Sequence, residues 1–257
     1  MTGTSPNIGG GIAEGLADEG ARVVCVDVAP DNARQCAEWI RHRGGDALGV
    51  ACDVTDEAAV EAMVARAREA YGGVDVLVNN AGILGGLSVL EMPLERWTRQ
   101  LTVNLTGTFL CTKHVARLMV ERGTKGSIIV IASTAGHQGQ AGNIGYCTSK
   151  SGLLNFTRAA AMDLSRHGIR VNSLTPTATD VEEGVERAVA WGRARPERRG
   201  RLLEFQRMVP TGQLPSPRHY ARAAVFLASD DAEMITGFDL RVDAGAIAKY
   251  WPWVPHP

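Results

Sequence analysis

The 257-residue sequence lacks the features of several classes of protein. No apolar run approaches the roughly 20 residues that span a bilayer. The first residues do not combine a basic region with an apolar run, so they do not have the pattern of a signal peptide. The formal net charge is −1, which gives no general reason to expect nucleic acid or an anionic membrane as a partner. We therefore expect a small-molecule partner, with neither nucleic acid nor a membrane.

Paired cysteines and grouped histidines are lacking as well. The five cysteines are odd in number and form no CxxC pair, which favours reduced thiols in the cytoplasm over a disulfide framework. The six histidines are scattered without ligand spacing, so we expect no metal site. With 45% hydrophobic and 21% charged residues, the composition is that of a globular protein with a substantial core.

Short Val/Ile-rich runs alternate with helical patterns along nearly the whole chain. The runs lack polar/apolar alternation, which is typical of strands buried on both faces; they lie at 22–28, 48–54, 74–82, 126–134 and 169–176. Helical stretches lie near 8–19, 31–43, 56–71, 95–121 and 144–166. This order predicts one α/β domain over 1–257, a doubly wound parallel sheet with helices on both faces. Ligands bind beyond the carboxyl ends of such strands.

The opening segment, TGTSPNIGGG, has the pattern of a dinucleotide-binding turn. Gly3 permits a tight turn, and Gly9 lets the following helix pack closely. The free N–H groups at the start of that helix would face a pyrophosphate. The predicted contacts in this turn are Gly3, Ser5, Asn7, Ile8 and Gly9.

Asp27 closes the next run, 18 residues after Gly9. A carboxylate there accepts hydrogen bonds from both hydroxyls of the adenosine ribose and repels a 2′-phosphate. No Lys or Arg lies in the turn or directly after Asp27. The sequence thus favours NAD over NADP, with a solvated strand-end carboxylate as the alternative interpretation of Asp27.

Two further turns follow predicted strands. Asp53, next to Val54, could cap the adenine edge, or it could act like an N-cap for the helix after Asp56. The NNAG segment at 79–82 has small residues that let the backbone approach a ligand, or it is simply a tight turn. We include in the predicted cofactor site Asp53, Val54, Asn80, Ala81 and Gly82.

Tyr146 and Lys150 are four residues apart in a predicted helix and so share one face. The Lys150 ammonium can favour the phenolate and lower the pKa of Tyr146, making it a general acid/base. Ser133, at the end of a strand, can hydrogen-bond a substrate oxygen. Asn104 is a polar residue within a helix and needs a partner. The alternative is a packed tyrosine beside an extended lysine.

Together these motifs resemble the short-chain dehydrogenase/reductase family over nearly the entire chain. The shared motifs are the glycine turn, Asp53, NNAG, Asn104, Ser133, YxxxK, RVNSLTP and the late VDAG. The resemblance implies a Rossmann-type fold and a catalytic tetrad. In this family the tyrosine exchanges the proton, the serine polarises the carbonyl, the lysine holds the nicotinamide ribose, and the asparagine helps to hold a relay water. The corresponding residues are Asn104, Ser133, Tyr146 and Lys150.

The sequence departs from the family pattern at three places. Asn7 replaces the middle glycine of the turn, and asparagine also visits left-handed backbone conformations. Thr177 stands where a Pro-Gly pair is usual; Pro176, Thr177 and Thr179 remain the expected contacts on the nicotinamide side. The third departure is the first strand, which only Met1 represents.

That strand is central in sheets of this type, so its loss would leave unpaired backbone groups in the core. We therefore expect an upstream start, with a GTG codon for the family's valine read as Met1. The native protein would then have about ten more residues before Met1, a typical strand with its lead-in.

The family places a mobile substrate lid at about 178–215. This segment has seven arginines between Arg187 and Arg207, which would recognise a carboxylate or phosphate, or form ion pairs along a solvated helix. His137, Gln138 and Asn143 are expected at the mouth of the pocket.

The tail 249–257 carries three large aromatic residues that would pack against another subunit or against the lid. Family members commonly form dimers and tetramers, so we expect a homotetramer.

The leading hypothesis is an NAD-dependent oxidoreductase that interconverts a secondary alcohol and a ketone. A 3-oxoacyl-thioester reductase is the main enzymatic alternative. A non-catalytic NAD-binding protein would not need Tyr146 or Ser133, and an epimerase or dehydratase for nucleotide sugars would be longer. The sequence does not identify the substrate.

Overall fold

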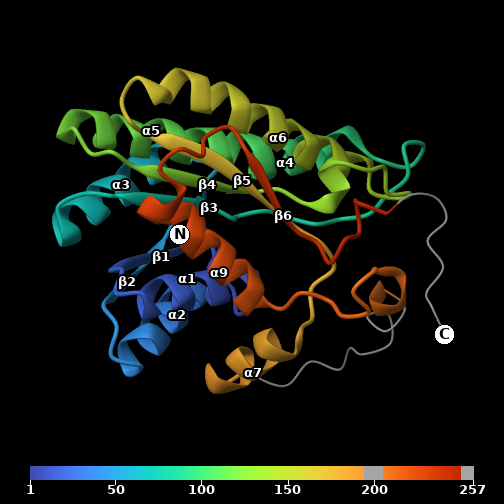
Figure 1. Cartoon of the computed structure of the whole chain (residues 1–257), viewed down its shortest axis with the longest axis horizontal. Coiled ribbons are helices and arrows are strands. Elements are labelled where there is room, and N and C mark those ends of the chain that lie inside the picture. Colours follow the sequence, from blue (N-terminus) through green and yellow to red (C-terminus); the bar gives the residue numbers. More distant parts are fainter. Residues whose placement is uncertain (194–204, 250–257) are drawn as a thin grey trace.

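Parallel strands form the middle layer of the molecule in the computed structural model, which describes residues 1–193 and 205–249 (Figure 1). One part of the sheet pairs β1 with β2, and the other has the order β3-β4-β5-β6. All pairs are parallel, as the strand–helix order predicts. The strands are β1 (Val23–Asp27), β2 (Ala47–Ala51), β3 (Val76–Asn79), β4 (Ser127–Ile131), β5 (Arg170–Pro176) and β6 (Asp239–Val242).

Helices cover both faces of the sheet (Figure 1). One face is covered by α1 (Ile8–Asp18), α2 (Pro30–His42) and α9 (Pro217–Ala228). The other is covered by α3 (Glu57–Tyr71), α4 (Leu94–Leu101) with a π-helical turn (η1, Thr102–Thr106), α5 (Gly107–Arg122) and α6 (Ile144–Ser165). The remaining elements are η2 (Thr134–Gly136), α7 (Glu182–Ala190) and η3 (Asp230–Ala232).

The strand residues alternate between two apolar cores, one on each face. In β4, Ile128 and Val130 belong to the core beneath α3, α5 and α6. Ile129 and Ile131 belong to the core beneath α1, α2 and α9. All four side chains are buried, so β4 needs apolar residues at every position. This explains why the run IIVI lacks polar/apolar alternation.

Met1 and Thr2 bridge the two parts of the sheet at the position of the expected central strand. Thr2 forms a parallel bridge with Val26 of β1, and its N–H donates to the carbonyl of Val78 in β3 at 3.0 Å. The carbonyl of Met1 accepts from the N–H of Val26 at 2.9 Å. The strand position is thus occupied at its carboxyl end, where the glycine turn begins.

The five predicted strands and five predicted helices are present, with ends that differ by a few residues. The structure corrects one helix: the stretch predicted over 95–121 is interrupted by the π-helical turn that contains Asn104. It adds α9 and β6, for which the sequence analysis made no prediction, and places α7 in the segment predicted as a lid.

Candidate active site

The candidate catalytic residues meet at the carboxyl ends of β3 and β4. Ser133 lies two residues beyond β4 and begins the η2 turn, where its Oγ accepts the N–H of Ala135 at 3.2 Å. Tyr146 and Lys150 lie in the first two turns of α6. Asn104 lies in the π-helical turn between α4 and α5. The structure therefore brings together four residues that span more than 40 positions of the sequence.

Burial dominates the titration of Tyr146. It raises the pKa of the phenol, while a hydrogen bond with Ser133 lowers it in part. The expected lowering of this pKa by the Lys150 ammonium is wrong for this structure. The Lys150 Nζ lies 5.8 Å from the centre of the Tyr146 ring and donates a 2.7 Å hydrogen bond to the carbonyl of Ile131.

Lys150 itself is buried, with 5% of its surface exposed. Removal from water lowers the pKa of its ammonium from 10.5 to about 8. A carbonyl partner compensates only part of the lost hydration. The site thus holds a lysine that loses its proton more easily than a solvated one.

Asn104 has no exposed surface and satisfies both ends of its side-chain amide. Its Oδ1 accepts the N–H of Ile83 at 2.7 Å, and its Nδ2 donates to the carbonyl of Ile83 at 3.0 Å. The same Nδ2 donates to the Ser149 hydroxyl of α6 at 3.0 Å. The sequence analysis required partners for this polar residue, and the structure supplies them. Ser149, which it did not single out, links the asparagine to the helix of Tyr146.

The glycine turn and the NNAG segment lie against each other. Gly3 has φ +69°, and a Cβ at Gly3 would lie 2.8 Å from the Cα of Ala81. A Cβ at Gly9 would collide with the carbonyl oxygen of Gly3, so both glycines are required for the close approach. The Asn80 Nδ2 donates to that same carbonyl at 2.8 Å.

Thr2 is a site residue that the sequence analysis did not identify. Its buried hydroxyl accepts the N–H groups of both Asn80 and Ala81 at 3.1 Å. It therefore fixes the NNAG segment to the start of the glycine turn. Its position in the sequence, directly before Gly3 of the predicted turn, could have indicated that it belongs to the site.

Asn7 does not adopt the left-handed conformation that was offered to explain it. Its φ is −82°, and it precedes α1 without a side-chain capping bond. Its Oδ1 is buried and has no hydrogen-bond partner among the described residues. Gly184 of α7 packs against this side chain: a Cβ there would lie 3.1 Å from the Oδ1. Nearby, the carbonyl of Ser5 accepts the N–H of Gly10 at 2.7 Å.

Asp27 ends β1 as predicted and is 8% exposed. Its Oδ1 accepts the N–H of Ala29 at 2.9 Å, while no donor contacts Oδ2 within 1–193 and 205–249. Asp53 instead uses its Oδ1 to accept the N–H and hydroxyl of Thr55. The N-cap of α3 is Asp56, so Asp53 stabilises the preceding turn.

The residues after β5, which are the contacts predicted on the nicotinamide side, contact one another. Pro176 ends the strand. The Thr179 hydroxyl donates to the carbonyl of Thr177 and lies within hydrogen-bond distance of the Tyr220 hydroxyl, both at 3.2 Å. The Thr177 hydroxyl accepts from Thr134 of the η2 turn at 3.5 Å.

Arg187 of α7 fixes the first part of the predicted lid to the glycine turn. Its guanidinium donates to the Glu14 carboxylate of α1 at 2.7 and 2.9 Å and to the carbonyl of Pro6 at 2.7 Å. Arg193 contacts Asn32 and Gln35 of α2. These arginines therefore bind other segments of the chain rather than neighbours along one helix. Four more predicted lid arginines, Arg195, Arg198, Arg199 and Arg201, lie outside the described residues.

The three predicted residues at the pocket mouth differ in their surroundings. The His137 Nε2 lies 3.3 Å from the Thr175 hydroxyl and 3.0 Å from Asp239 of β6, so the histidine has partners that its sequence neighbours did not reveal. The Asn143 Oδ1 is buried without a partner among the described residues. Gln138 is exposed.

The residues fit a nicotinamide dinucleotide. A close turn that excludes any Cβ at Gly3 and Gly9 lies at the start of α1, and the orphaned Oδ1 of Asn7 lies beside it. The open oxygen of Asp27 is free to accept a hydrogen bond without breaking the bond to Ala29. These are acceptor and N–H groups of the kind that recognise a ribose and a pyrophosphate.

One group of possible metal ligands lies away from this site, on α3 and α5. The ligand atoms of Glu57, Glu61 and His114 lie within 4.8 Å of one another. Lys113 donates to the same Glu57 oxygen as His114. The spacing of the histidines along the sequence did not indicate this cluster.

Comparison with known proteins identifies the family. A family model described as Enoyl-(Acyl carrier protein) reductase matches residues 3–246. The chain is 39% identical over 251 residues to the cis-4-hydroxycyclohexanecarboxylate dehydrogenase of Sinomonas cyclohexanicum, covering 96% of this chain and 95% of that protein. It is 36% identical over 249 residues to the D-threitol dehydrogenase of Mycolicibacterium smegmatis, covering 97% and 92%.

A solved structure agrees. A short-chain dehydrogenase/reductase from Burkholderia xenovorans, described as putative, superimposes with a TM-score of 0.86 at 34% identity, over 97% of this chain and 95% of that one. The chain belongs to the short-chain dehydrogenase/reductase family. It is an oxidoreductase with a nicotinamide cofactor, of the class that interconverts an alcohol carbon and a carbonyl carbon.

The buried ammonium gives a prediction for stability. Below pH 8 Lys150 is charged in both the folded and the unfolded state, so folding has to bury a charged ammonium and loses stability by it. Between pH 8 and 10.5 the folded state releases this proton first, and stability rises with pH. We expect Lys150→Met to raise the free energy of unfolding at pH 7 by about 1–3 kcal/mol, since loss of the bond to Ile131 offsets part of the gain.

Denaturant unfolding at pH 7 and near pH 10 measures this effect. The gain from Lys150→Met should shrink as the pH rises, while the exposed Lys125→Met changes little at either pH. A Lys150→Met protein that is less stable than the original chain at pH 7 would contradict the assignment.

Proposed function

We propose that the protein is an NAD-dependent dehydrogenase that interconverts a secondary alcohol and a ketone. The observation that carries this proposal is that Ser133, Tyr146 and Lys150 lie together at the carboxyl end of the sheet. The glycine turn is at the same end, and Thr2 joins it to β1, the strand that ends in Asp27. A phenol, a hydroxyl and a buried ammonium at one strand edge are suited to proton transfer at an alcohol oxygen.

In this proposal, the bound nicotinamide supplies the hydride acceptor or donor. In oxidation the phenolate of Tyr146 would take the proton from the alcohol oxygen, and in reduction its phenol would give a proton to the carbonyl oxygen. The Ser133 hydroxyl, which partly lowers the pKa of Tyr146, would orient that oxygen. Lys150 would hold the nicotinamide ribose, turning from the carbonyl of Ile131. Asn104 positions α6 through Ser149.

The preference for NAD rests on Asp27. Its carboxylate is buried against the end of β1 and has one open oxygen, which fits a ribose hydroxyl and would repel a 2′-phosphate. The other proposed contacts on this side come from the glycine turn, Val54 and the NNAG segment. Pro176, Thr177 and Thr179 would contact the nicotinamide side. Asp53 contributes only by holding its turn, since its bonds go to Thr55.

Polyols and ring alcohols are the substrate classes to test first, because two relatives are named for D-threitol and for cis-4-hydroxycyclohexanecarboxylate. A thioester of an acyl carrier is the second candidate, since the matching family model is described as Enoyl-(Acyl carrier protein) reductase. The oxidised state of cytosolic NAD pools favours oxidation of the alcohol.

We further propose a cytoplasmic homo-oligomer with one domain. The location is supported by five unpaired thiols, of which four are buried. No helix in 1–193 or 205–249 is both long and apolar enough to cross a membrane. Assembly is supported by apolar side chains left exposed on α5 and α6, namely Phe109 and Met162. The tail aromatics Tyr250, Trp251 and Trp253 lie outside the described residues.

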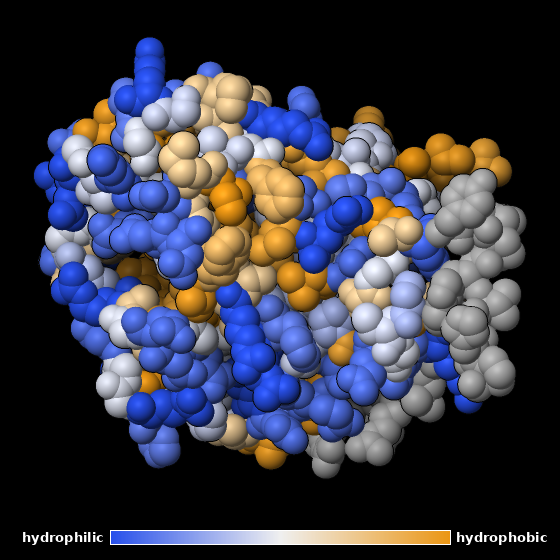
Figure 2. Space-filling view, viewed as in Figure 1, coloured by the Kyte–Doolittle hydropathy of each residue, from blue (hydrophilic) through white to orange (hydrophobic). Residues whose placement is uncertain are grey.

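Apolar side chains also gather in the middle of the face that carries α9 and β6 (Figure 2). In this part of the sequence Phe226, Met234 and Phe238 are exposed. Apolar surface on two separate faces is what a dimer of dimers would bury, because a tetramer with two-fold axes needs more than one interface.

The catalytic proposal predicts the effect of Tyr146→Phe. Loss of the phenolic proton should lower kcat with a polyol or ring alcohol by about 10²–10⁴-fold, because a positioned acid/base contributes that much. Affinity for NAD, measured by tryptophan fluorescence, should stay within about twofold. Tyr71→Phe, which removes a hydroxyl bound to Asp46, is the matched control. Undiminished turnover in Tyr146→Phe would refute the role.

The cofactor proposal predicts the effect of Asp27→Asn. The amide keeps an oxygen for Ala29 but removes the charge, so the ratio of NAD to NADP affinity should fall at least about tenfold. Asp53→Asn should leave this ratio unchanged. Titrations of both variants with NAD and with NADP at one salt concentration measure this ratio. If the ratio is unaltered in Asp27→Asn, residues other than Asp27 determine the choice of cofactor.

The assembly proposal predicts the effect of Phe109→Glu. A charge on the exposed apolar surface of α5 should lower the molar mass measured by light scattering, because it would be buried in the interface. Val189→Glu, on the exposed surface of α7, should leave the mass unchanged. A monomeric original chain at micromolar concentration would contradict the proposal.

A further inference from the structure

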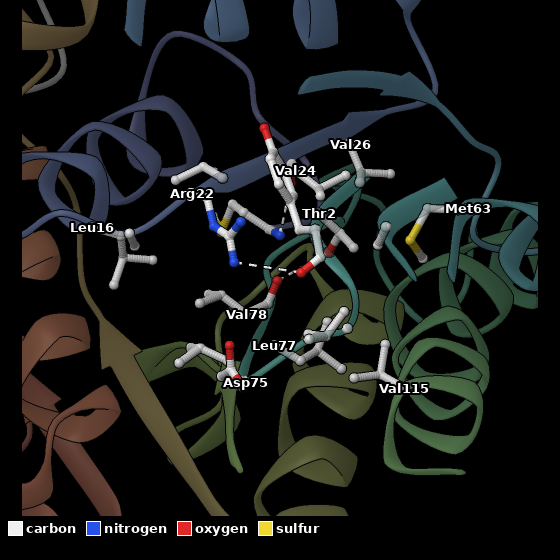
Figure 3. A pocket seen from close by; sticks show the side chains of 18 of the residues that line it. Thr2, Leu16, Arg22, Val24, Val26, Met63, Asp75, Leu77, Val78 and Val115 are labelled. Atoms are coloured by element: carbon white, nitrogen blue, oxygen red, sulfur yellow. Dashed lines mark hydrogen bonds between the residues drawn. The ribbon is translucent and has the colours of Figure 1, made fainter. Parts of the chain in front are cut away.

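Two turns at the carboxyl ends of strands carry residues of the site, and each has buried polar contacts. The glycine turn is fixed by Thr2, which lies between β1 and β3 and whose hydroxyl accepts two N–H groups of the NNAG segment (Figure 3). The second turn is η2, which Ser133 begins and which His137 directly follows. The imidazole of His137 lies beside Asp239 of β6, a carboxylate for which the proposed mechanism has no use.

The Asp239 carboxylate is largely buried, with 15% of its side chain exposed. Its Oδ1 accepts the hydroxyls of Ser173 at 2.6 Å and of Thr175 at 2.7 Å, on the face of β5 that packs against α6. Its Oδ2 is buried without a well-aligned hydrogen bond from the described residues, while the Nε2 of His137 lies 3.0 Å away. Because an uncompensated carboxylate oxygen is costly inside a protein, this imidazole is its compensating partner.

The contacts of the imidazole place one of its hydrogens. The Thr175 hydroxyl directs its hydrogen toward Asp239, so its oxygen offers only lone pairs to the His137 Nε2 at 3.3 Å. The Asp239 carboxylate also offers only lone pairs to this nitrogen. Both neighbours of Nε2 are therefore acceptors, and the network assigns a hydrogen to Nε2. His137 thus donates toward β5 and β6 whether its ring is neutral or charged.

His137 joins two strands that are not neighbours. The sheet has the order β4-β5-β6, so an imidazole that comes from the turn after β4 and reaches β6 crosses the end of β5. The same turn lies tightly against α6, because a Cβ at Gly136 would lie 2.7 Å from the carbonyl oxygen of Lys150. The turn is therefore held between α6 and β6, within four residues of Ser133.

The Ser133 hydroxyl takes its position from this turn. Its Oγ accepts the N–H of Ala135 at 3.2 Å, inside η2, so a displacement of η2 displaces the hydroxyl as well. Ser133 also lowers the pKa of Tyr146 in part, so its position affects the phenol. A change at the far end of η2 thus reaches both groups that are to face the substrate oxygen.

We propose that His137 is a positioning residue for the catalytic serine: its contact with Asp239 fixes η2 and thereby directs the Ser133 hydroxyl to the substrate oxygen. This role rests on the dehydrogenase function proposed above. His137 neither touches the substrate nor exchanges its proton, and it acts only through Ser133. Loss of the imidazole should therefore lower turnover only when the serine hydroxyl is present.

The kinetic test measures NAD-dependent oxidation of a polyol or ring alcohol by His137→Leu. We expect kcat to fall at least about tenfold, with the KM for the alcohol within about twofold, because a misplaced serine loses a bond that strengthens in the transition state. His137→Gln, whose amide N–H can replace the Nε2 donor, should recover most of the loss. In a Ser133→Ala background, His137→Leu should cause no further loss. The exposed His167→Leu is the matched control and should turn over as the original chain does.

A second readout needs no turnover. Tyrosine labelled with carbon-13 at Cζ reports by NMR on the phenol of Tyr146, whose signal is assigned with Tyr146→Phe. Ser133→Ala and His137→Leu should move this signal in the same direction, while His137→Gln and His167→Leu leave it in place. If His137→Leu does not fold, Thr175→Val replaces it in both experiments. This variant removes the hydroxyl that contacts both the imidazole and the carboxylate, so it should act in the same direction.

Three results would overturn the positioning role. They are an unchanged kcat in His137→Leu, an equal loss with and without the Ser133 hydroxyl, and a Tyr146 signal that does not move in His137→Leu. Failure of the proposed function gives a different result, because the original chain would then oxidise none of the alcohols. The labelled tyrosine would still decide whether His137 positions Ser133.

Discussion

The side-chain amide of Asn104 is the interaction on which the geometry of the site depends. Its two polar atoms hold the loop after β3 through Ile83 and the helix of Tyr146 through Ser149, all without contact with water. These bonds therefore fix the distances between the π-helical turn, the loop after β3 and α6, which are distant in sequence. The π-helical turn around Asn104 directs this side chain inward, and such turns are frequent at functional sites. Buried polar networks of this kind specify one arrangement because every unpaired member is costly.

Burial also sets the electrostatics of the catalytic residues. It lowers the pKa of Lys150 to about 8 and raises that of Tyr146, so burial shifts both groups toward their neutral forms, while Lys150 stays charged below pH 8. Lys150 has a carbonyl rather than a charged partner. The proton chemistry thus depends on groups that a bound cofactor and substrate bring to the site. On the cofactor side, Arg187 joins α7 to Glu14 and Pro6, so α7 is fixed to the glycine turn.

Local patterns predicted much of this site. Ser133 and Asp27 follow Val/Ile-rich runs, so their positions at strand ends could be inferred from the rule for parallel sheets. The spacing of Tyr146 and Lys150 predicted a shared helix face. The contacts that decide chemistry were not local: Arg187 meets Glu14 across 173 positions, and Lys150 turns toward a strand 19 positions earlier. Thr2 and Ser149 were missed because small hydroxyl residues have no periodic signature, and their partners are backbone groups and an asparagine elsewhere in the chain.

The central claim is hydride transfer between an alcohol carbon and a nicotinamide at the Tyr146 site. The most direct measurement is to supply NAD and a secondary alcohol, such as a polyol or a hydroxycyclohexane acid, deuterated at its carbinol carbon. Mass spectrometry then follows the label. The account predicts one deuterium in the reduced nicotinamide and a ketone that has lost it. Tight binding of NAD without any transfer of label, across polyols and ring alcohols alike, would contradict the claim.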